Sequence, residues 1–195
     1  MNVYIWTNSL KNAYIGEVYE YSYDFRNKTA SQVTSDWYVT AAWTPAYNSN
    51  WFTSSNSSVA RMNKNIESLA NATKITLSFT VVLGSGSTWT WIRLMWASRT
   101  YWTWVLFYVH LNSCQYFIGW DEVTGSSWLS SWTHTTTVVL DLTNKTAVFS
   151  RTWKTDYSTS ITDTQISNIK NNITLSEIFA WNSDWAISNW YILVE

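Results

Sequence analysis

The chain has 195 residues, a length that is ordinary for one β-sandwich domain and long enough to bury a core without metal or disulfide support. Twelve Lys and Arg against thirteen Asp and Glu leave a net charge of −1, which disfavours nucleic acid and anionic membranes as partners. The single cysteine, Cys114, excludes an internal disulfide, and no Cys/His cluster has the spacing of a zinc site. We therefore expect no metal and no cofactor, and we interpret Cys114 as a buried structural residue.

The first seventeen residues contain one five-residue unit twice, NVYIW at 2–6 and NAYIG at 12–16. Two short strands are marginal on their own, so we interpret residues 1–17 as a connector to an upstream partner and 18–195 as the domain. No secretory signal is visible at this end of the sequence. The longest apolar stretch, 105–109, is too short to span a bilayer, so we expect no membrane insertion.

Alternation of apolar and polar residues predicts strands throughout the chain. The clearest is 74–81, KITLSFTV, and a hairpin is expected from 137–142 and 146–149 around Asn144-Lys145. About ten to thirteen strands are too many for one comfortable open sheet, which favours two packed sheets. Further strands are expected at 18–25, 37–43, 88–96, 103–111, 114–120, 174–180 and 187–194.

One helix is predicted after these strands. Thr162 to Gln165 fits a capping box, Ile161 and Ile166 form a hydrophobic staple, and the helix should end by 171–172. The sequence therefore predicts an all-β fold, a two-sheet antiparallel jelly-roll sandwich with one short surface helix. A parallel sheet, or helix in more than a quarter of the chain, would contradict it.

Tryptophan usage is abnormal, with sixteen Trp and only five Gly. Trp6 stands where the second copy of the repeated unit has Gly16, and several Trp directly follow Asn, Asp or Ser, where turns normally use Gly. One hypothesis is that UGA encodes glycine in the source organism, which the codons of the gene would test. The alternatives are sugar-stacking platforms and ordinary core aromatics. The residues in question include Trp37, Trp51, Trp128, Trp132, Trp185 and Trp190.

The residues do not form a recognisable catalytic pattern. Glu20 and Asp24 could share a strand face, but Glu17 falls on the opposite one, and the Glu-x-Asp-x-Glu motif of jelly-roll glucanases is absent. His110 and His134 have no accompanying Ser or Cys nucleophile motif. We therefore predict that the chain is not an enzyme and that these carboxylates are solvated strand ends.

Two loops form the candidate binding site. The first places an Arg between aromatic residues, a combination that can stack on a sugar and donate to its hydroxyls. The second carries an acidic pair at a predicted loop tip, where it could accept from sugar hydroxyls, bind calcium or simply form a turn. A hairpin turning at 112–113 would bring both loops to one end, although two ordinary exposed turns remain the alternative. The candidate residues are Trp96, Arg99, Tyr101, Trp120, Asp121 and Glu122.

The entry AYIGEVYEYSYDFRNKT at 13–29 and the closing ISNWYILVE at 187–195 resemble concanavalin A-like (laminin G-like) jelly-roll modules of bacteriophage virion proteins. The resemblance implies two antiparallel sheets, carried on a tail, fibre or capsid decoration that contacts host glycans. It fixes no universal binding residues, so none is transferred.

Together these observations predict a non-catalytic, glycan-binding host-attachment module of a phage virion, released by lysis. The alternative is a purely structural virion decoration domain, and a jelly-roll glycoside hydrolase ranks third. A binding module should show aromatic and polar side chains at a loop-rimmed groove, whereas a structural module should show a large apolar patch. Expected partners are a surface glycan, other virion chains and a further copy of the chain.

Overall fold

The computed structural model describes residues 13–15, 18–26, 28–36, 45–48, 51–54, 59–82, 89–95, 105–110, 113–118, 121–125, 133–152, 154–181 and 186–195. Within this part, every pairing between strands is antiparallel. The strands form a nine-stranded and a six-stranded sheet, and the helices are short. This confirms the predicted antiparallel sandwich.

The nine-stranded sheet has the order β1-β2-β15-β6-β11-β12-β13, and β4 adds to β15 while β3 pairs with β4. Its strands are β1 (Ala13–Ile15), β2 (Val18–Asp24), β3 (Pro45–Asn48), β4 (Trp51–Ser54), β6 (Lys74–Val82), β11 (Thr133–Asp141), β12 (Thr146–Arg151), β13 (Lys154–Ser160) and β15 (Ala186–Val194).

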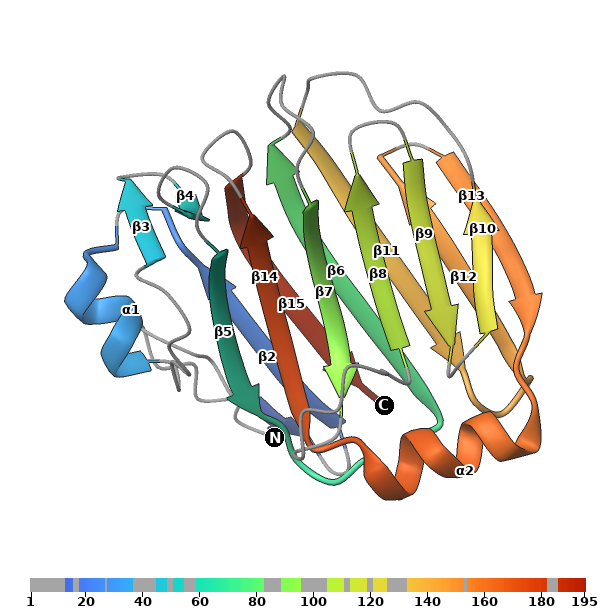
Figure 1. Cartoon of the computed structure of the whole chain (residues 1–195). Coiled ribbons are helices and arrows are strands. Elements are labelled where there is room, and N and C mark those ends of the chain that lie inside the picture. The colour runs from blue at the N-terminus through green and yellow to red at the C-terminus, as the bar shows by residue number, and fades with distance from the viewer. Residues whose placement is uncertain are drawn as a thin grey trace.

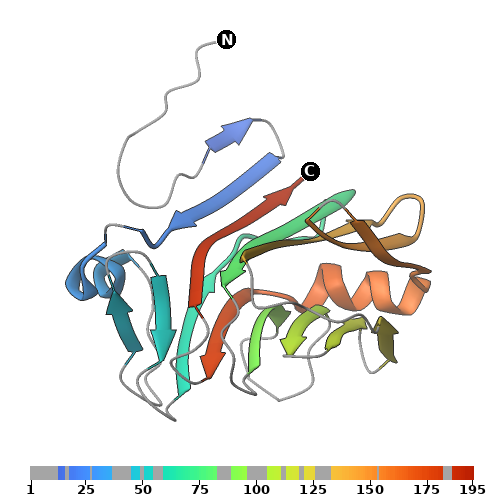
Figure 2. The same cartoon turned by 90° about the horizontal axis from the view of Figure 1, so that it is seen from above.

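The six-stranded sheet has the order β10-β9-β8-β7-β14-β5. Figures 1 and 2 show it as a second layer lying over the larger sheet. Its strands are β5 (Val59–Asn65), β7 (Trp89–Met95), β8 (Val105–His110), β9 (Ser113–Ile118), β10 (Asp121–Gly125) and β14 (Leu175–Trp181).

The core lies between the sheets because each strand turns alternate residues inward. In β6, Ile75 and Leu77 are at most 1% exposed, while Thr76 and Ser78, which alternate with them, are half-buried on the outward face. Each fully buried aliphatic side chain stabilises the fold by roughly 1.5–3 kcal/mol relative to exposure. The period-2 pattern of 74–81 is therefore confirmed as a strand with one face in the core.

Trp190 connects the two layers. It lies inside β15, is 1% exposed, and its Nε1 donates to Ser176 Oγ on β14 across the sandwich at 3.2 Å. Its ring also contacts that of Tyr21, with centroids 6.4 Å apart. The idea that Trp190 follows a turn is wrong, because the buried indole fills the core where glycine would leave a void.

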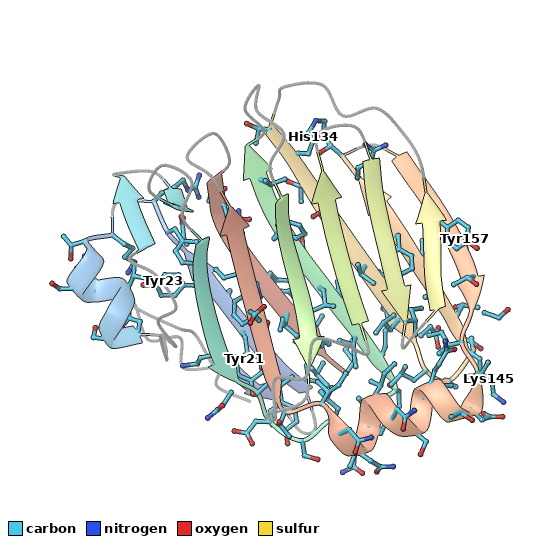
Figure 3. The ribbon with its side chains drawn as sticks, viewed as in Figure 1. Tyr21, Tyr23, His134, Lys145 and Tyr157 are labelled. Atoms are coloured by element: carbon cyan, nitrogen blue, oxygen red, sulfur yellow. The ribbon has the colours of Figure 1, made fainter. Side chains whose placement is uncertain are left out.

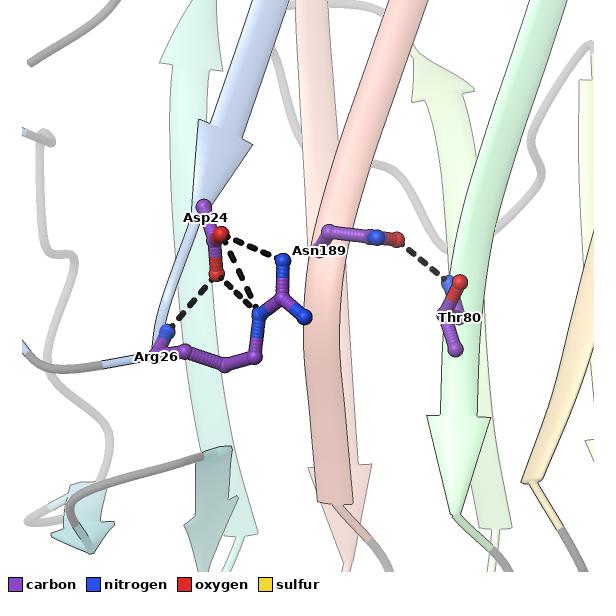
Figure 4. Close-up of polar contacts among 4 residues, drawn as sticks. All are labelled: Asp24, Arg26, Thr80 and Asn189. Atoms are coloured by element: carbon purple, nitrogen blue, oxygen red, sulfur yellow. Dashed lines mark hydrogen bonds and ion pairs between the residues drawn. The ribbon is translucent and has the colours of Figure 1, made fainter.

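A bulge shifts the register of β15 between Ile187 and Asn189. Before the bulge β15 pairs with β4, and after it β15 pairs with β2. The Asn189 side chain compensates for the disturbed ladder, since its Oδ1 accepts from the backbone N–H of Thr80 at 3.0 Å (Figure 4). The single strand β15 can therefore pair with both β4 and β2 along the same edge.

The predicted helix is α2 (Asp163–Asn172), and its capping box is confirmed: the Thr162 side chain accepts from the Gln165 backbone N–H, and the Gln165 side chain accepts from that of Thr162. A second helix, α1 (Ala30–Asp36), was not predicted, so the expectation of a single helix is wrong. Its own capping signal was in the sequence, because Thr29 and Gln32 exchange the equivalent bonds.

Both helices are tied to the sheets. The Tyr23 hydroxyl on β2 donates to Asp36 Oδ2 at the end of α1 at 3.0 Å, and Figure 3 shows Tyr23 lying next to that helix. Near the other helix, Lys145 Nζ forms an ion pair with Asp163 Oδ1 at 2.8 Å. Lys145 closes the turn between β11 and β12 with a φ of 56°, in the left-handed region.

The remaining strand predictions were partly right. The expected strands correspond to β2, β6, β7, β8, β9, β11, β12, β14 and β15, whereas β3, β4, β5, β10 and β13 were not predicted. The expected strand at 37–43 and most of the proposed connector lie outside the described residues. Within the connector, β1 pairs with β2 at the edge of the nine-stranded sheet, while the boundary at residue 17 stays a prediction.

Candidate functional site

The strands that flank the predicted binding loops end together. The register pairs Leu94 of β7 with Val105 of β8, and Val105 with Ile118 of β9. The predicted hairpin of β8 and β9 is thereby confirmed, although Ser113 already belongs to β9. The last residues of β7 and β9 lie at the end of the six-stranded sheet where α2 lies (Figure 1).

The structure describes only two of the six candidate binding residues. Trp96, Arg99, Tyr101 and Trp120 lie outside the described residues. Asp121 and Glu122 are described in their backbone, as the first two residues of β10, where they pair with Ile118 and Phe117. The prediction of a loop tip for the acidic pair is wrong, because only two residues separate β9 from β10 and pairing resumes at Asp121.

Helix α2 borders this end of the sheet. The Gln165 side chain donates from Nε2 to the carbonyl oxygen of Ile118 at 2.9 Å, and Ile118 is 1% exposed. Ile169, on the same helix, is fully buried against the core. The capping box that begins α2 thus also holds the helix against the last residue of β9.

The outward face of the six-stranded sheet is identified by its contacts across the sandwich. Ser176 faces the core, since its hydroxyl accepts from Trp190, and Ile178 is buried there as well. Strand alternation therefore places Glu177 on the outward face. Glu177 is nevertheless 0% exposed.

Glu177 belongs to one continuous cross-strand row that the ladder registers define. The row contains three charged residues, one amide and two apolar residues, and it reaches the acidic pair of the predicted loop site. Across the sheet, from β10 to β5, it consists of Glu122, Phe117, Leu106, Arg93, Glu177 and Asn63. We call these six residues the outward row.

A second row lies one pleat further from α2 and is rich in aromatic residues. The same registers give its members from β10 to β5 as Thr124, Gln115, Tyr108, Trp91, Phe179 and Arg61. Charged and aromatic residues therefore occupy adjacent rows on one face, the combination that sugar recognition uses.

Sequence reasoning missed Glu177 as a site residue. The strand around it was expected at 174–180, but its sequence, Leu175 to Phe179, has apolar residues at odd and even positions, so alternation alone does not say which face is outward. The available signal was a carboxylate in the middle of a strand, a residue type that is rarely buried without a partner.

The outward face of the nine-stranded sheet is different in chemistry. It is lined with hydroxyl groups, and neighbouring strands exchange hydrogen bonds between them, as at Thr80 Oγ1 and Thr135 Oγ1, 2.9 Å apart, and from Thr137 Oγ1 to Ser78 Oγ at 3.3 Å. Charges occur toward its margins, where Asp24 binds Arg26 and Lys74 binds Glu195. The described part of this face is thus rich in hydroxyl groups.

Among the described residues, no three His, Cys, Asp or Glu gather in a way that could hold a metal ion. In the same part of the chain, no helix is both long and apolar enough to cross a membrane.

No family model and no curated protein matches the chain. Solved structures do match in fold. The CBM2 module of the evolved Dit of Lactobacillus casei BL23 phage J-1 aligns with a TM-score of 0.54 at 9% identity, over 92% of this chain and 91% of that module. The carbohydrate recognition domain of Emp46p aligns with a TM-score of 0.56 at 10% identity, over 87% and 95%.

A Trypanosoma rangeli sialidase also aligns, with a TM-score of 0.56 at 9% identity, and here 97% of this chain covers only 29% of the enzyme. The β-sandwich architecture of this chain therefore recurs both in separate modules and within an enzyme chain.

Proposed function

We propose that the chain is a non-catalytic, glycan-binding host-attachment module of a phage virion. The observation that carries the proposal is the outward face of the six-stranded sheet, where a charged row and an aromatic row lie side by side and extend to the acidic pair at β10. The phage Dit module and the Emp46p domain share the fold, and their names describe carbohydrate-binding units, one of them from a phage.

In this proposal, the glycan is held at the α2 end of the six-stranded sheet. Arg99 and its aromatic neighbours Trp96 and Tyr101 supply stacking and donors from one connection, while Trp120, Asp121 and Glu122 supply a platform and acceptors from the other. The two connections leave from neighbouring strand ends, as required for a shared site.

Hydrolysis has less support from this face. Glycoside hydrolysis needs two carboxyl groups about 5–9.5 Å apart. Glu122 and Glu177 are the carboxylate residues that the registers place in the outward row, and four strand spacings separate them, which is roughly 19 Å. They are too far apart to act as such a pair.

The test is a glycan-array screen of the whole chain, followed by titration of the retained oligosaccharide. We expect binding by the unmodified protein and a loss of about tenfold or more for Arg99→Ala and for Asp121→Ala, as expected when a charged hydrogen-bonding group is removed. The matched control is Thr137→Ala on the opposite face, which should leave affinity unchanged. Unchanged affinity in both folded loop variants would remove this site, and no retained glycan would remove the function.

A further inference from the structure

We propose that the outward face of the nine-stranded sheet is an interface on which a second copy of this chain packs about a two-fold axis. The inference goes beyond the proposed function, because it concerns the opposite sheet and does not depend on glycan binding. Within the described part of the chain, neither α1 nor α2 lies over this face (Figure 2). Packing through it leaves the six-stranded sheets of both copies on the outside.

The centre of this face is uncharged. The ladder registers place two adjacent rows of outward residues on β15, β6, β11 and β12, and every side chain in them is half-buried. One row consists of Tyr191, Ser78, Thr137 and Ser150, and the other of Leu193, Thr76, Val139 and Val148. We call these eight residues the central patch. A contiguous group with this much apolar surface on an outward face is typical of a protein contact.

The polar groups of the central patch have partners within the sheet. Thr137 Oγ1 donates to Ser78 Oγ at 3.3 Å, and Ser150 Oγ donates to the carbonyl oxygen of Thr137 at 3.4 Å. Covering a hydroxyl that already has a partner costs less than covering one that is bonded only to water. A second protein surface can therefore bury the aliphatic side chains of this patch without a large desolvation cost.

Charged residues surround the patch, and carboxylates prevail at its α2 end. Glu20, Glu195 and Asp141 lie there with one lysine, Lys74, which binds Glu195. Burial and the nearby charges of Glu20 and Glu195 raise the pKa of Tyr191, so both carboxylates lie beside the central patch. An uncharged centre with a charged rim is the usual composition of a protein–protein interface.

Cations prevail at the other end of the face. Arg26 and Lys28 follow the end of β2, where the one carboxylate is Asp24, the residue that Arg26 binds. A two-fold axis that runs across the strands, between the two rows of the central patch, exchanges the ends. Arg26 of one copy then lies over the carboxylate end of its partner, and the symmetry repeats this contact. The complementary ends favour a second copy of this chain as the occupant.

The size of the face suits such a dimer. From β2 to β13 it measures about 29 Å across the strands and about 27 Å along them, or on the order of 800 Å². Specific interfaces bury about 800 Å² on each partner. Two sheets can also pack face to face with their strands nearly aligned, the geometry that this axis produces.

The first experiment measures the mass of the whole chain without glycan, by sedimentation equilibrium over the micromolar concentration range. We expect a dimer that dissociates on dilution. Val139→Lys should weaken it at least about a hundredfold, because an ammonium group would be buried without a partner in the centre of the interface. The charge-matched control is Thr164→Lys at an exposed position of α2, which should leave the dimer unchanged.

The second experiment tests the exchange of ends and does not require Val139→Lys to fold. Glu20→Lys and Arg26→Glu, both at the rim of the face, should each weaken the dimer about tenfold, because the two-fold axis repeats each altered contact. The double variant should regain most of the lost affinity, since the opposite charges meet again with their signs reversed. Asp24 is the same in the single and double variants, so its contact with Arg26 does not produce the rescue.

A chain that stays monomeric over this range overturns the inference. A dimer that folded Val139→Lys leaves intact overturns it as well, because the contact then lies on another surface. A double variant that associates no better than the single ones overturns the two-fold arrangement. The proposed function is tested apart from this result, since monomeric Val139→Lys should bind the retained glycan with the same affinity per chain as the unmodified protein.

Discussion

The outward faces of the two sheets cover the same core and yet differ in chemistry. On the nine-stranded sheet, hydroxyls such as Thr80 and Thr135 bond to one another, so the face largely satisfies itself. On the six-stranded sheet, the outward row carries the charged residues Arg93, Glu177 and Glu122. The proposed glycan site therefore lies on the sheet with the charged and aromatic rows, while the opposite sheet presents hydroxyl groups that bond to one another.

The largest expected effect comes from Trp190, which joins the two sheets across the core. Trp190→Gly should lower the free energy of unfolding by about 3–5 kcal/mol, because it empties the core and leaves Ser176 without its donor. Equilibrium denaturation measures this loss. Leu193→Ala, at a half-buried outward position of the same strand, is the control and should cost much less.

The same substitution bears on the codon hypothesis. A well-folded Trp190→Gly protein with unchanged stability would mean that glycine belongs at this position. The structure favours tryptophan there, while the hypothesis remains a prediction for Trp37, Trp128, Trp132 and Trp185, which lie outside the described residues.

The sequence was sufficient to predict a strand where one face of that strand is buried and the other is solvated. Alternation in 74–81 identified β6, and the capping box identified α2, because both signals are local. It was insufficient for β3 and β4, four-residue strands whose pairing is decided by distant partners.

The same limit applies to the site. Glu122 was identified as a candidate, but in a loop, because the Thr124-Gly125-Ser126 run after it is typical of a turn, whereas β10 pairs with β9 from Asp121 to Gly125. Glu177 could not be connected to Arg93 from the sequence, because eighty-odd residues separate them and only the register of β14 on β7 makes them neighbours.

A smaller effect is expected at the border between the site and α2. Thr162→Ala removes the cap of α2 and should cost about 1 kcal/mol. Because Gln165 holds the end of β9 through Ile118, amide exchange should accelerate there and not in β12. Hydrogen exchange read by mass spectrometry tests this, with exposed Thr164→Ala as the control. Equal acceleration in both strands would contradict a local link.

A still smaller effect concerns the charges of the nine-stranded sheet. Hydrogen bonds from the Arg26 side chain, at 2.6 Å for Nη2 to Oδ2, lower the pKa of Asp24 (Figure 4). A lowered folded-state pKa stabilises the fold above the unfolded value of about 3.9, and this contribution is lost as pH falls through the folded pKa.

Both side chains are about half exposed, so screening keeps the contribution of this pair below about 1 kcal/mol. Asp24→Asn should therefore lower stability slightly at pH 7 and converge with the unmodified chain in strong acid, as followed by denaturation at each pH. Arg26→Ala should reproduce the effect, and 1 M salt should reduce it. A difference that persists in strong acid would assign the effect to packing.

The smallest expected effect tests most directly whether the outward faces of the two sheets differ in function. In the double variant Thr80→Val and Thr135→Val, both partners of one outward hydroxyl pair are replaced by apolar groups of nearly the same shape, an exchange that is close to neutral when no polar group is left unsatisfied. Stability should therefore change by no more than about 0.5 kcal/mol. Glycan affinity should not change at all, because these residues lie on the nine-stranded sheet and not on the outward row.

The single variant Thr135→Val serves as the control, since it leaves the Thr80 hydroxyl without this partner and should be less stable than the double variant. If glycan affinity falls in the stable double variant, the ligand contacts the nine-stranded sheet, and the assignment of recognition to the other face has to be reversed.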